Sequence, residues 1–192
     1  LMAPQLADWL GHWPEESSNR LSLVETGPGE GSLARDLASL LVEQWPSLAS
    51  RLELVLVEPN QGMADRQRAL LADCPIPVRW SSFEHLAQAP VRGVVIAHEV
   101  LDALPVERIQ WDGALWRQQV VRLQGDPSQG FSLRLEPGEP LTPEERAQLE
   151  PLGLLVPHPE RLQGWCSEWH RGVEPWLAAC GGALAQGFLL VV

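Results

Sequence analysis

Three glycines and an acidic residue lie close together near the amino end of the chain. Residues 21–32 read as an apolar strand that ends at Glu25 and then turns through Gly27, Gly29 and Gly31. Glycine adopts the backbone angles of tight turns, and its lack of a Cβ lets a ligand approach the backbone closely. The first N–H groups of the helix that follows have no partner within that helix, so they can bind a ligand. The segment therefore predicts a ligand-binding loop.

The spacing of the glycines excludes two common nucleotide-binding loops. A dinucleotide fingerprint has the form G-x-G-x-x-G with an acid about 20 residues later, whereas the spacing here is G-x-G-x-G. The phosphate-binding loop of ATPases needs the sequence G-K-[ST], and this chain contains no lysine. It contains no tyrosine either, which excludes a tyrosine base or nucleophile, just as the missing lysine excludes Schiff-base chemistry.

A second acidic residue, Glu58, ends the next apolar run, Leu52–Val57. The carboxyl ends of neighbouring parallel strands face one crevice, so we expect Glu58 beside the glycine loop. A carboxylate at that place can accept hydrogen bonds from both hydroxyls of a ribose. A lone strand-end Glu is more often a helix cap or a solvated charge. Its position one strand after the glycine loop favours the ribose role.

A third polar segment follows the apolar run Val94–Ala97. Residues 98–106 read His-Glu-Val-Leu-Asp-Ala-Leu-Pro-Val. The acid and glycine loop resemble those of the class I S-adenosylmethionine-dependent methyltransferases, and residues 98–106 resemble the (N/H)-E-x-x-D-A-L-P-V motif of one such family, the MidA family. The resemblance extends over about residues 21–192, with the motif at 98–106 as its most specific part. Further features that resemble this family are Val24 to Gly29, Arg66-Gln67, Trp116, and Ser167-Glu168-Trp169 followed by Trp176.

The resemblance implies an S-adenosylmethionine cofactor and the residues that hold it. The glycine loop would surround the methionine part, the acid after the second strand would hold the ribose, and residues after the third strand would contact the adenine. Phe83 is as readily explained as a core residue. The residues assigned to the cofactor are Glu25, Gly27, Gly29, Gly31, Glu58, Ser82, Phe83 and His98.

Glu99 and Asp102 are the catalytic candidates. The mitochondrial members of the MidA family are arginine methyltransferases that assist the assembly of respiratory complex I, which implies a protein substrate bearing an arginine. Two neighbouring carboxylates are costly unless a cation joins them, and a guanidinium suits contact with both. If residues 99–104 form a helical turn, the two acids lie on one face. Alternatively, Asp102 caps the turn before Pro105 and Glu99 accepts a backbone hydrogen bond.

Two other functions stay open at this point. A non-catalytic assembly factor could keep the cofactor-binding fold and bind a partner protein, because a fold does not settle function. Trp165, Trp169 and Trp176 lie near one helical face by spacing and would then be interface anchors. A core role is favoured, because Gly172 and Pro175 interrupt that helix. A nicotinamide-dependent oxidoreductase is disfavoured by the glycine spacing.

Composition excludes further classes of function. The formal net charge of −11 disfavours binding to nucleic acid. We expect no metal site, because His158, Cys166 and His170 match no usual zinc spacing. No apolar run approaches 18 residues and no signal peptide is visible, so we expect no membrane insertion and a cytoplasmic location, although mitochondrial relatives exist. The oligomeric state is left open.

Short, nearly continuous apolar runs predict strands that are buried on both faces of a parallel sheet. Helical patterns separate these runs, which predicts a doubly wound, mostly parallel α/β sheet with a Rossmann-like class I methyltransferase fold. By the resemblance, the strand order is 3-2-1-4-5 and the central strand carries the glycine loop. The expected strands are Leu21–Val24, Leu52–Val57, Val78–Trp80, Val94–Ala97 and Phe188–Val192.

The remaining elements are expected within a single domain, 1–192. Residues 105–140 read as a small antiparallel β insert with a turn at Asp112-Gly113. Because the chain opens without a methionine and closes on an apolar run, we expect a fragment whose sheet is incomplete at its C-terminus. Predicted helix signals are caps at Ser32 and Asn60, a capping box from Thr142 to Glu145, and helical patterns over Leu162–His170 and Pro175–Ala185.

Overall fold

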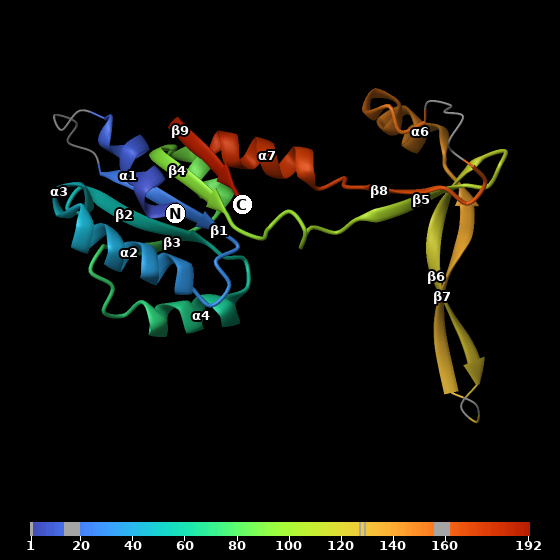
Figure 1. Ribbon diagram of the computed structural model, residues 1–192, viewed down its shortest axis with the longest axis horizontal. Coiled ribbons are helices and arrows are strands. Elements are labelled where there is room, and N and C mark those ends of the chain that lie inside the picture. Colours follow the sequence, from blue (N-terminus) through green and yellow to red (C-terminus); the bar gives the residue numbers. More distant parts are fainter. Residues whose placement is uncertain (1, 14–19, 127, 129, 156–161) are drawn as a thin grey trace. The chain divides into compact units, whose positions relative to one another are not determined.

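The computed structural model describes residues 2–13, 20–126, 128, 130–155 and 162–192 (Figure 1). They belong to two compact units, of which the first comprises residues 1–103 and 173–192 and the second residues 104–172. The predicted β insert, 105–140, lies inside the second unit, whose boundaries are wider. The organisation of residues 1–192 as one domain stays a prediction.

In the described part of the first unit, a five-stranded parallel sheet forms the centre. The last strand, β9 (Leu184–Val191), pairs with β4 (Val91–Ala97), where Phe188 lies opposite Val94 and Leu190 opposite Ile96. This confirms the predicted fold class, the strand order 3-2-1-4-5 and the place of the last strand. In spatial order the strands are β3 (Val78–Ser81), β2 (Leu52–Val57), β1 (Leu21–Thr26), β4 (Val91–Ala97) and β9 (Leu184–Val191).

Helices cover both faces of this sheet, which explains why the strands read as continuous apolar runs. All six residues of β1 are buried. Leu21 and Leu23 belong to a buried cluster with side chains from the first three helices of this unit, whereas Val24 belongs to a second cluster with side chains from its last two helices. The helices described in this unit are α1 (Met2–Gly11), α2 (Ser32–Gln44), α3 (Pro46–Ala49), α4 (Gln61–Leu70), α5 (Phe83–Gln88) and α7 (Val173–Gly182).

The starts of α2 and α4 test the predicted helix caps. Asn60 caps α4, because its Oδ1 accepts a hydrogen bond from the Met63 N–H at 3.1 Å. The expectation that Ser32 caps α2 is wrong. Ser32 is the first residue of α2, and the N-cap residue is Gly31, with φ 86° and no side-chain cap. The left-handed glycine turns the chain directly into the helix.

The second unit contains an antiparallel sheet with the order β7-β6-β5-β8 among its described residues. The predicted turn at Asp112-Gly113 is confirmed, since Gly113 has φ 100° and Asp112 Oδ1 accepts the Ala114 and Leu115 N–H groups at 2.8 and 2.7 Å. The elements of this unit are β5 (Glu107–Trp111), β6 (Trp116–Asp126), β7 (Gly130–Pro140), α6 (Pro143–Leu149), a 3₁₀ turn (Glu150–Leu152) and β8 (Cys166–Trp169). The capping box of Thr142 and Glu145 starts α6, as predicted.

The expected helix over Leu162–His170 is wrong, because Cys166–Trp169 forms strand β8. Its backbone pairs with β5, where Ser167 lies opposite Ile109. Hydrogen bonds to a distant strand have therefore overridden the helical spacing of the apolar residues. Trp165 and Trp169 pack in the cluster of the second unit, whereas Trp176 packs in the first, so the three do not share a helical face.

A helix that crosses a membrane needs about 20 predominantly apolar residues, and the helices of the described ranges are shorter. None of them is both long enough and apolar enough to cross a bilayer.

Candidate functional site

The glycine loop follows β1 at the carboxyl end of the central strand. Gly27, Gly29 and Gly31 have φ values of 62°, 53° and 86°, a left-handed conformation that strains residues with a Cβ. A Cβ built on Gly29 would meet no described atom within 4 Å, whereas one on Gly27 would lie 3.2 Å from a methyl of Val100. The open space at Gly29 is where a ligand can approach the loop.

Glu25 lies two residues before Gly27 and is only 6% exposed. Burial raises the pKa of its carboxyl to about 7, although a hydrogen bond from the Ala34 N–H acts in the opposite direction. The Oε2 atom of Glu25 is buried and has no hydrogen-bond partner among the described residues. Buried polar atoms are usually paired, so this oxygen suits a ligand that brings a cationic donor.

A cavity of about 320 Å³ opens at the carboxyl ends of β1, β2 and β3. Its volume lies within the range of small-molecule sites. The cavity brings together Gly27 of the glycine loop, Glu58 after β2, and Ser82 and Phe83 after β3, which the sequence had placed in one site. The residues that line it are Thr26, Gly27, Val57, Glu58, Pro59, Ser81, Ser82, Phe83, Glu84, Val100 and Trp176.

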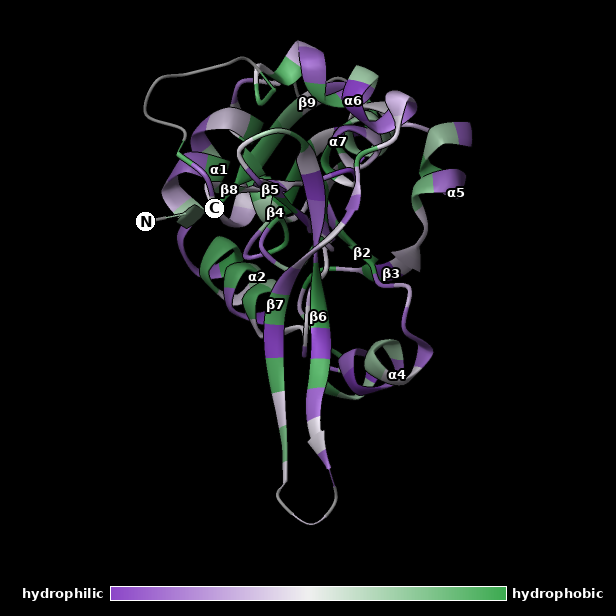
Figure 2. Cartoon of the chain, turned by 90° about the vertical axis from the view of Figure 1, so that its right-hand side faces the viewer, coloured by the Kyte–Doolittle hydropathy of each residue, from purple (hydrophilic) through white to green (hydrophobic). Residues whose placement is uncertain are grey.

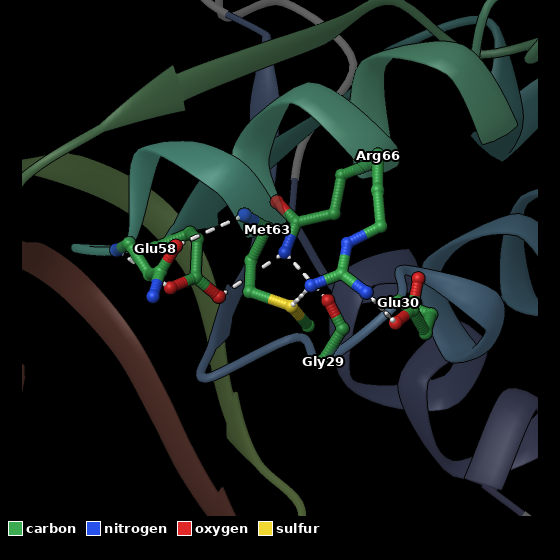
Figure 3. A network of polar contacts seen from close by, with 7 residues as sticks. Gly29, Glu30, Glu58, Met63 and Arg66 are labelled. Carbon is green, nitrogen blue, oxygen red and sulfur yellow. Dashed lines mark hydrogen bonds and ion pairs between the residues drawn. The ribbon is translucent and has the colours of Figure 1, made fainter.

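The Glu58 carboxylate already accepts two hydrogen bonds from its own neighbourhood. Oε1 accepts from the Asn60 N–H at 2.8 Å, and Oε2 accepts from Gln67 Nε2 at 3.1 Å. A carboxylate has about four lone-pair sites, so two remain for ligand hydroxyls. Gln67 Nε2 also donates to the Gly29 carbonyl at 2.7 Å. The glycine loop and Glu58 therefore belong to one hydrogen-bonded network, part of which Figure 3 shows.

Sequence reasoning noted Gln67 only as a family-like residue and missed its position at the centre of this network. Gln67 is fully buried, and it shares the buried face of α4 with Ala64. A polar residue on the inner face of an otherwise amphipathic helix is the signal that could have identified it.

Ser82 and Phe83 have local structural roles beside their place in the cavity wall. Ser82 Oγ accepts a hydrogen bond from the His85 N–H at 3.3 Å and so caps α5. Phe83 is partly buried and packs against the cluster that holds Val24. The core role weighed for Phe83 therefore exists, and it leaves part of the ring at the cavity.

His98, Glu99 and Asp102 are exposed in the segment that follows β4. Glu99 is the one non-glycine residue in the described ranges with positive φ, at 54°, and its N–H donates to the Val192 carbonyl at 2.9 Å. The helical turn considered over 99–104 is not formed, since Glu99 has left-handed rather than helical backbone angles and no residue of this range is assigned to a helix. A single turn closes from the Ala103 N–H to the Val100 carbonyl at 3.2 Å.

The structure places these three residues just after the carboxyl end of β4, and none of them belongs to the cavity wall. Among the described residues of this segment, only Val100 lines the cavity. The alternative roles weighed for the two acids are not seen: neither carboxylate accepts a hydrogen bond from a described residue.

Of the three metal ligands weighed from the sequence, the structure describes Cys166 and His170. His158 lies outside the described residues. Within those ranges, no group of three or more His, Cys, Asp or Glu side chains is placed to hold a metal ion.

Comparison with known proteins identifies the family. A sequence model of the family described as "Putative S-adenosyl-L-methionine-dependent methyltransferase" matches residues 1–192. The chain is 30% identical, over 146 residues and 66% of its length, to the mitochondrial protein arginine methyltransferase NDUFAF7 homolog of Drosophila melanogaster. It is 26% identical, over 162 residues and 73% of its length, to mitochondrial protein arginine methyltransferase NDUFAF7 of Mus musculus. The chain spans about a third of these relatives, covering 33% and 36% of them.

Two solved structures from Burkholderia thailandensis share the fold. One is a COG1565 superfamily member bound to S-adenosyl-homocysteine, with a TM-score of 0.63 and 24% identity over 95% of this chain and 42% of that one. The other is a native COG1565 superfamily protein, with a TM-score of 0.64 and 23% identity over 97% of this chain and 45% of that one. The family match and this shared fold agree with the glycine loop at the carboxyl end of β1. The chain therefore belongs to the MidA family of S-adenosylmethionine-dependent methyltransferases, and its cofactor is S-adenosylmethionine.

Proposed function

We propose that this chain belongs to a protein arginine methyltransferase in which Glu99 and Asp102 bind the substrate guanidinium. The observation that carries the proposal is the backbone of Glu99. A non-glycine residue with φ 54° costs about 1–3 kcal/mol and persists only where its surroundings enforce it. The strained residue follows β4, whose end lies beside the end of β1 in the register Thr26 to Ala97. Such strain is common at functional sites.

The residues present fit the cofactor. Glu25 Oε2, which has no hydrogen-bond partner in the described part of the chain, suits its ammonium group, and the open side of Gly29 leaves room for its methionine part. Glu58 has acceptor sites left for the ribose hydroxyls, and Ser82 and Phe83 line the side assigned to the adenine. Gly27 and Gly31 shape the loop, and His98 is proposed to border the site. The bound cofactor supplies an activated methyl group on its sulfonium.

Arginine sets two requirements for this site. The guanidinium is protonated under all ordinary conditions, so it must be bound as a cation. The nitrogen that gains the methyl group must also lose a proton. Glu99 and Asp102 meet both requirements in the proposal: their charge-assisted hydrogen bonds orient the guanidinium, and one carboxylate accepts the proton.

The names of the two relatives support a protein substrate. On the MidA resemblance, we extend the proposal to a substrate that takes part in the assembly of NADH dehydrogenase, respiratory complex I. Both relatives are mitochondrial by name. The cytoplasmic location stays a prediction for this chain.

A second candidate function is that of a binding module without catalysis. The observation that favours it is the ribbon of β6 and β7, on which apolar and polar residues alternate (Figure 2). Val121 lies opposite Leu135 and Leu123 opposite Leu133. Leu123 and Leu133 are 63% and 70% exposed, so one face of the ribbon is apolar and uncovered among the described residues. Such a face suits a protein partner.

The two functions are separated by incubating the purified protein with labelled S-adenosylmethionine and cell extract. An arginine methyltransferase transfers label to a protein, and mass spectrometry of the labelled band finds methylarginine. A binding module retains an extract protein without labelling it. Label on lysine or on a carboxyl group would reject the arginine proposal and keep the methyltransferase.

A further inference from the structure

We propose that Gln67 is a positioning residue of the cofactor site, which holds the Gly29 carbonyl and the Glu58 carboxylate in their binding arrangement. The proposal rests on the assignment of Gly29 and Glu58 to the cofactor in the function proposed above. Gln67 is 0% exposed and lies outside the cavity wall, so it acts through the residues that it binds.

The Gln67 amide is hydrogen-bonded on both of its ends. Nε2 donates to the Gly29 carbonyl at 2.7 Å and to Glu58 Oε2 at 3.1 Å, while Oε1 accepts from Trp80 Nε1 at 2.9 Å. An indole N–H can only donate, so Trp80 fixes which end of the amide is the acceptor. Both amide protons must then face Gly29 and Glu58. One side chain thereby joins the segments that follow β1 and β2 to strand β3.

Packing of α4 gives no reason for an amide at this position. Gln67 lies on the buried face of α4 with Ala64, and Leu71, at the end of the helix, is 4% exposed. An apolar side chain would continue this face without the cost of desolvating an amide. Gln67 also fills the space under the loop, because a Cβ on Gly31 would lie 3.4 Å from its Cγ. A polar residue that is buried and fully bonded here indicates a role in holding the site.

A neighbouring link between the loop and α4 is too exposed to fulfil this role. Arg66 and Glu30 form an ion pair at 3.1 Å, with side chains 61% and 60% exposed (Figure 3). Exposed ion pairs contribute little, because water competes with them. The buried Gln67 amide, shielded from water, is the contact that can hold the carbonyl and the carboxylate at a fixed separation.

The test is calorimetric titration of the protein with S-adenosyl-homocysteine, combined with thermal unfolding. Gln67→Met keeps the side-chain volume and removes all three hydrogen bonds, so we expect affinity to fall about tenfold to a hundredfold. The unfolding temperature should stay within a few degrees of the wild-type value or rise. Gln61→Met, at an exposed position of the same helix, is the matched control and should bind as the wild type does. Gln67→Glu should lose at least as much affinity as Gln67→Met, because a carboxylate cannot donate and repels Glu58.

A double-mutant cycle with Glu58→Ala tests whether Gln67 acts through Glu58. We expect Gln67→Met to cost clearly less affinity in the Glu58→Ala background than in the wild type. Wild-type affinity in Gln67→Met, or an equal loss in both backgrounds with a lower unfolding temperature, would overturn the proposal. If Glu58→Ala alone binds as the wild type does, the ribose assignment fails instead. Neither result depends on the arginine substrate, which is tested separately by methyl transfer.

Discussion

At the residue scale, Glu25 is a buried carboxylate with a pKa of about 7, against an ordinary value of 4.5. Between these two values the folded protein holds a proton that the unfolded chain has released. The free energy of unfolding therefore falls as the pH rises through this window. At 1.36 kcal/mol per pKa unit, the ionised carboxylate destabilises the protein by roughly 3 kcal/mol above pH 7. A cationic ligand group would relieve this cost.

The variant Glu25→Gln should lose this pH dependence, because an amide does not ionise. At pH 8 we expect its free energy of unfolding to exceed that of the wild type by roughly 3 kcal/mol, and below pH 4.5 the two should be nearly equal. Affinity for S-adenosyl-homocysteine should fall in the same variant. Urea denaturation at pH 4, 6 and 8 measures the effect, and a pH-independent difference would contradict the buried, titrating carboxylate.

Gly29 combines a left-handed backbone with an open side, and Gly29→Val acts on both. Valine at φ 53° should lower the free energy of unfolding by about 1–2 kcal/mol. A Cβ built on Gly29 meets no described atom within 4 Å, so the added side chain extends into open space. The side chain should therefore block the ligand, with affinity at least tenfold lower. Gly29→Ala, which shares the backbone strain, separates strain from obstruction in the same titration.

Glu99 and Asp102 are expected to act on turnover. Glu99→Gln keeps size and hydrogen bonding but loses charge, so methyl transfer should fall on the order of a hundredfold at unchanged cofactor affinity. Asp102→Asn should do likewise if it orients the guanidinium. Rates are measured with the labelled protein substrate once it is identified. Near-normal turnover in Glu99→Gln would remove this residue from the site.

At the element scale, the ribbon of β6 and β7 and the core of the second unit should respond differently to mutation. Leu133 is 70% exposed, so Leu133→Gln should change the free energy of unfolding by less than about 0.5 kcal/mol. Ile109 is 0% exposed, and Ile109→Ala should cost about 2–5 kcal/mol. Chemical denaturation compares the two. A large loss in Leu133→Gln would show that the apolar face is covered in solution.

Element types were predictable where one local signal was enough. Buried runs such as Leu52–Val57 predicted the strands, and their alternation with helical patterns predicted a parallel sheet, whereas the strand order came from the family resemblance. Strand β8 was missed, because its state depends on the edge of β5 rather than on its own spacing. Gln67 was overlooked because a polar residue on a buried face looks like a break in the pattern. The left-handed Glu99 has no signal in its residue type.

At the scale of the whole molecule, every residue assigned to the cofactor belongs to the first unit. Bound S-adenosyl-homocysteine should therefore slow amide hydrogen exchange around residues 25–31, 58–60 and 81–84, because each of these segments contributes residues to the cavity wall. Peptides from residues 104–172 should exchange as they do without ligand. Exchange followed by mass spectrometry measures this. Equal protection in both units would show that the second unit takes part in binding.

The first unit is interrupted in the chain, since residues 104–172 separate β4 from its partner β9. This order has a consequence in time during synthesis on the ribosome. At roughly 5–20 residues per second, the segment between the ends of β4 and β9 takes about 5–19 s to emerge. For that interval the outer edge of β4 has no strand to pair with and is open to other chains. The nascent chain thus needs protection longest at β4, while the contiguous second unit can already fold.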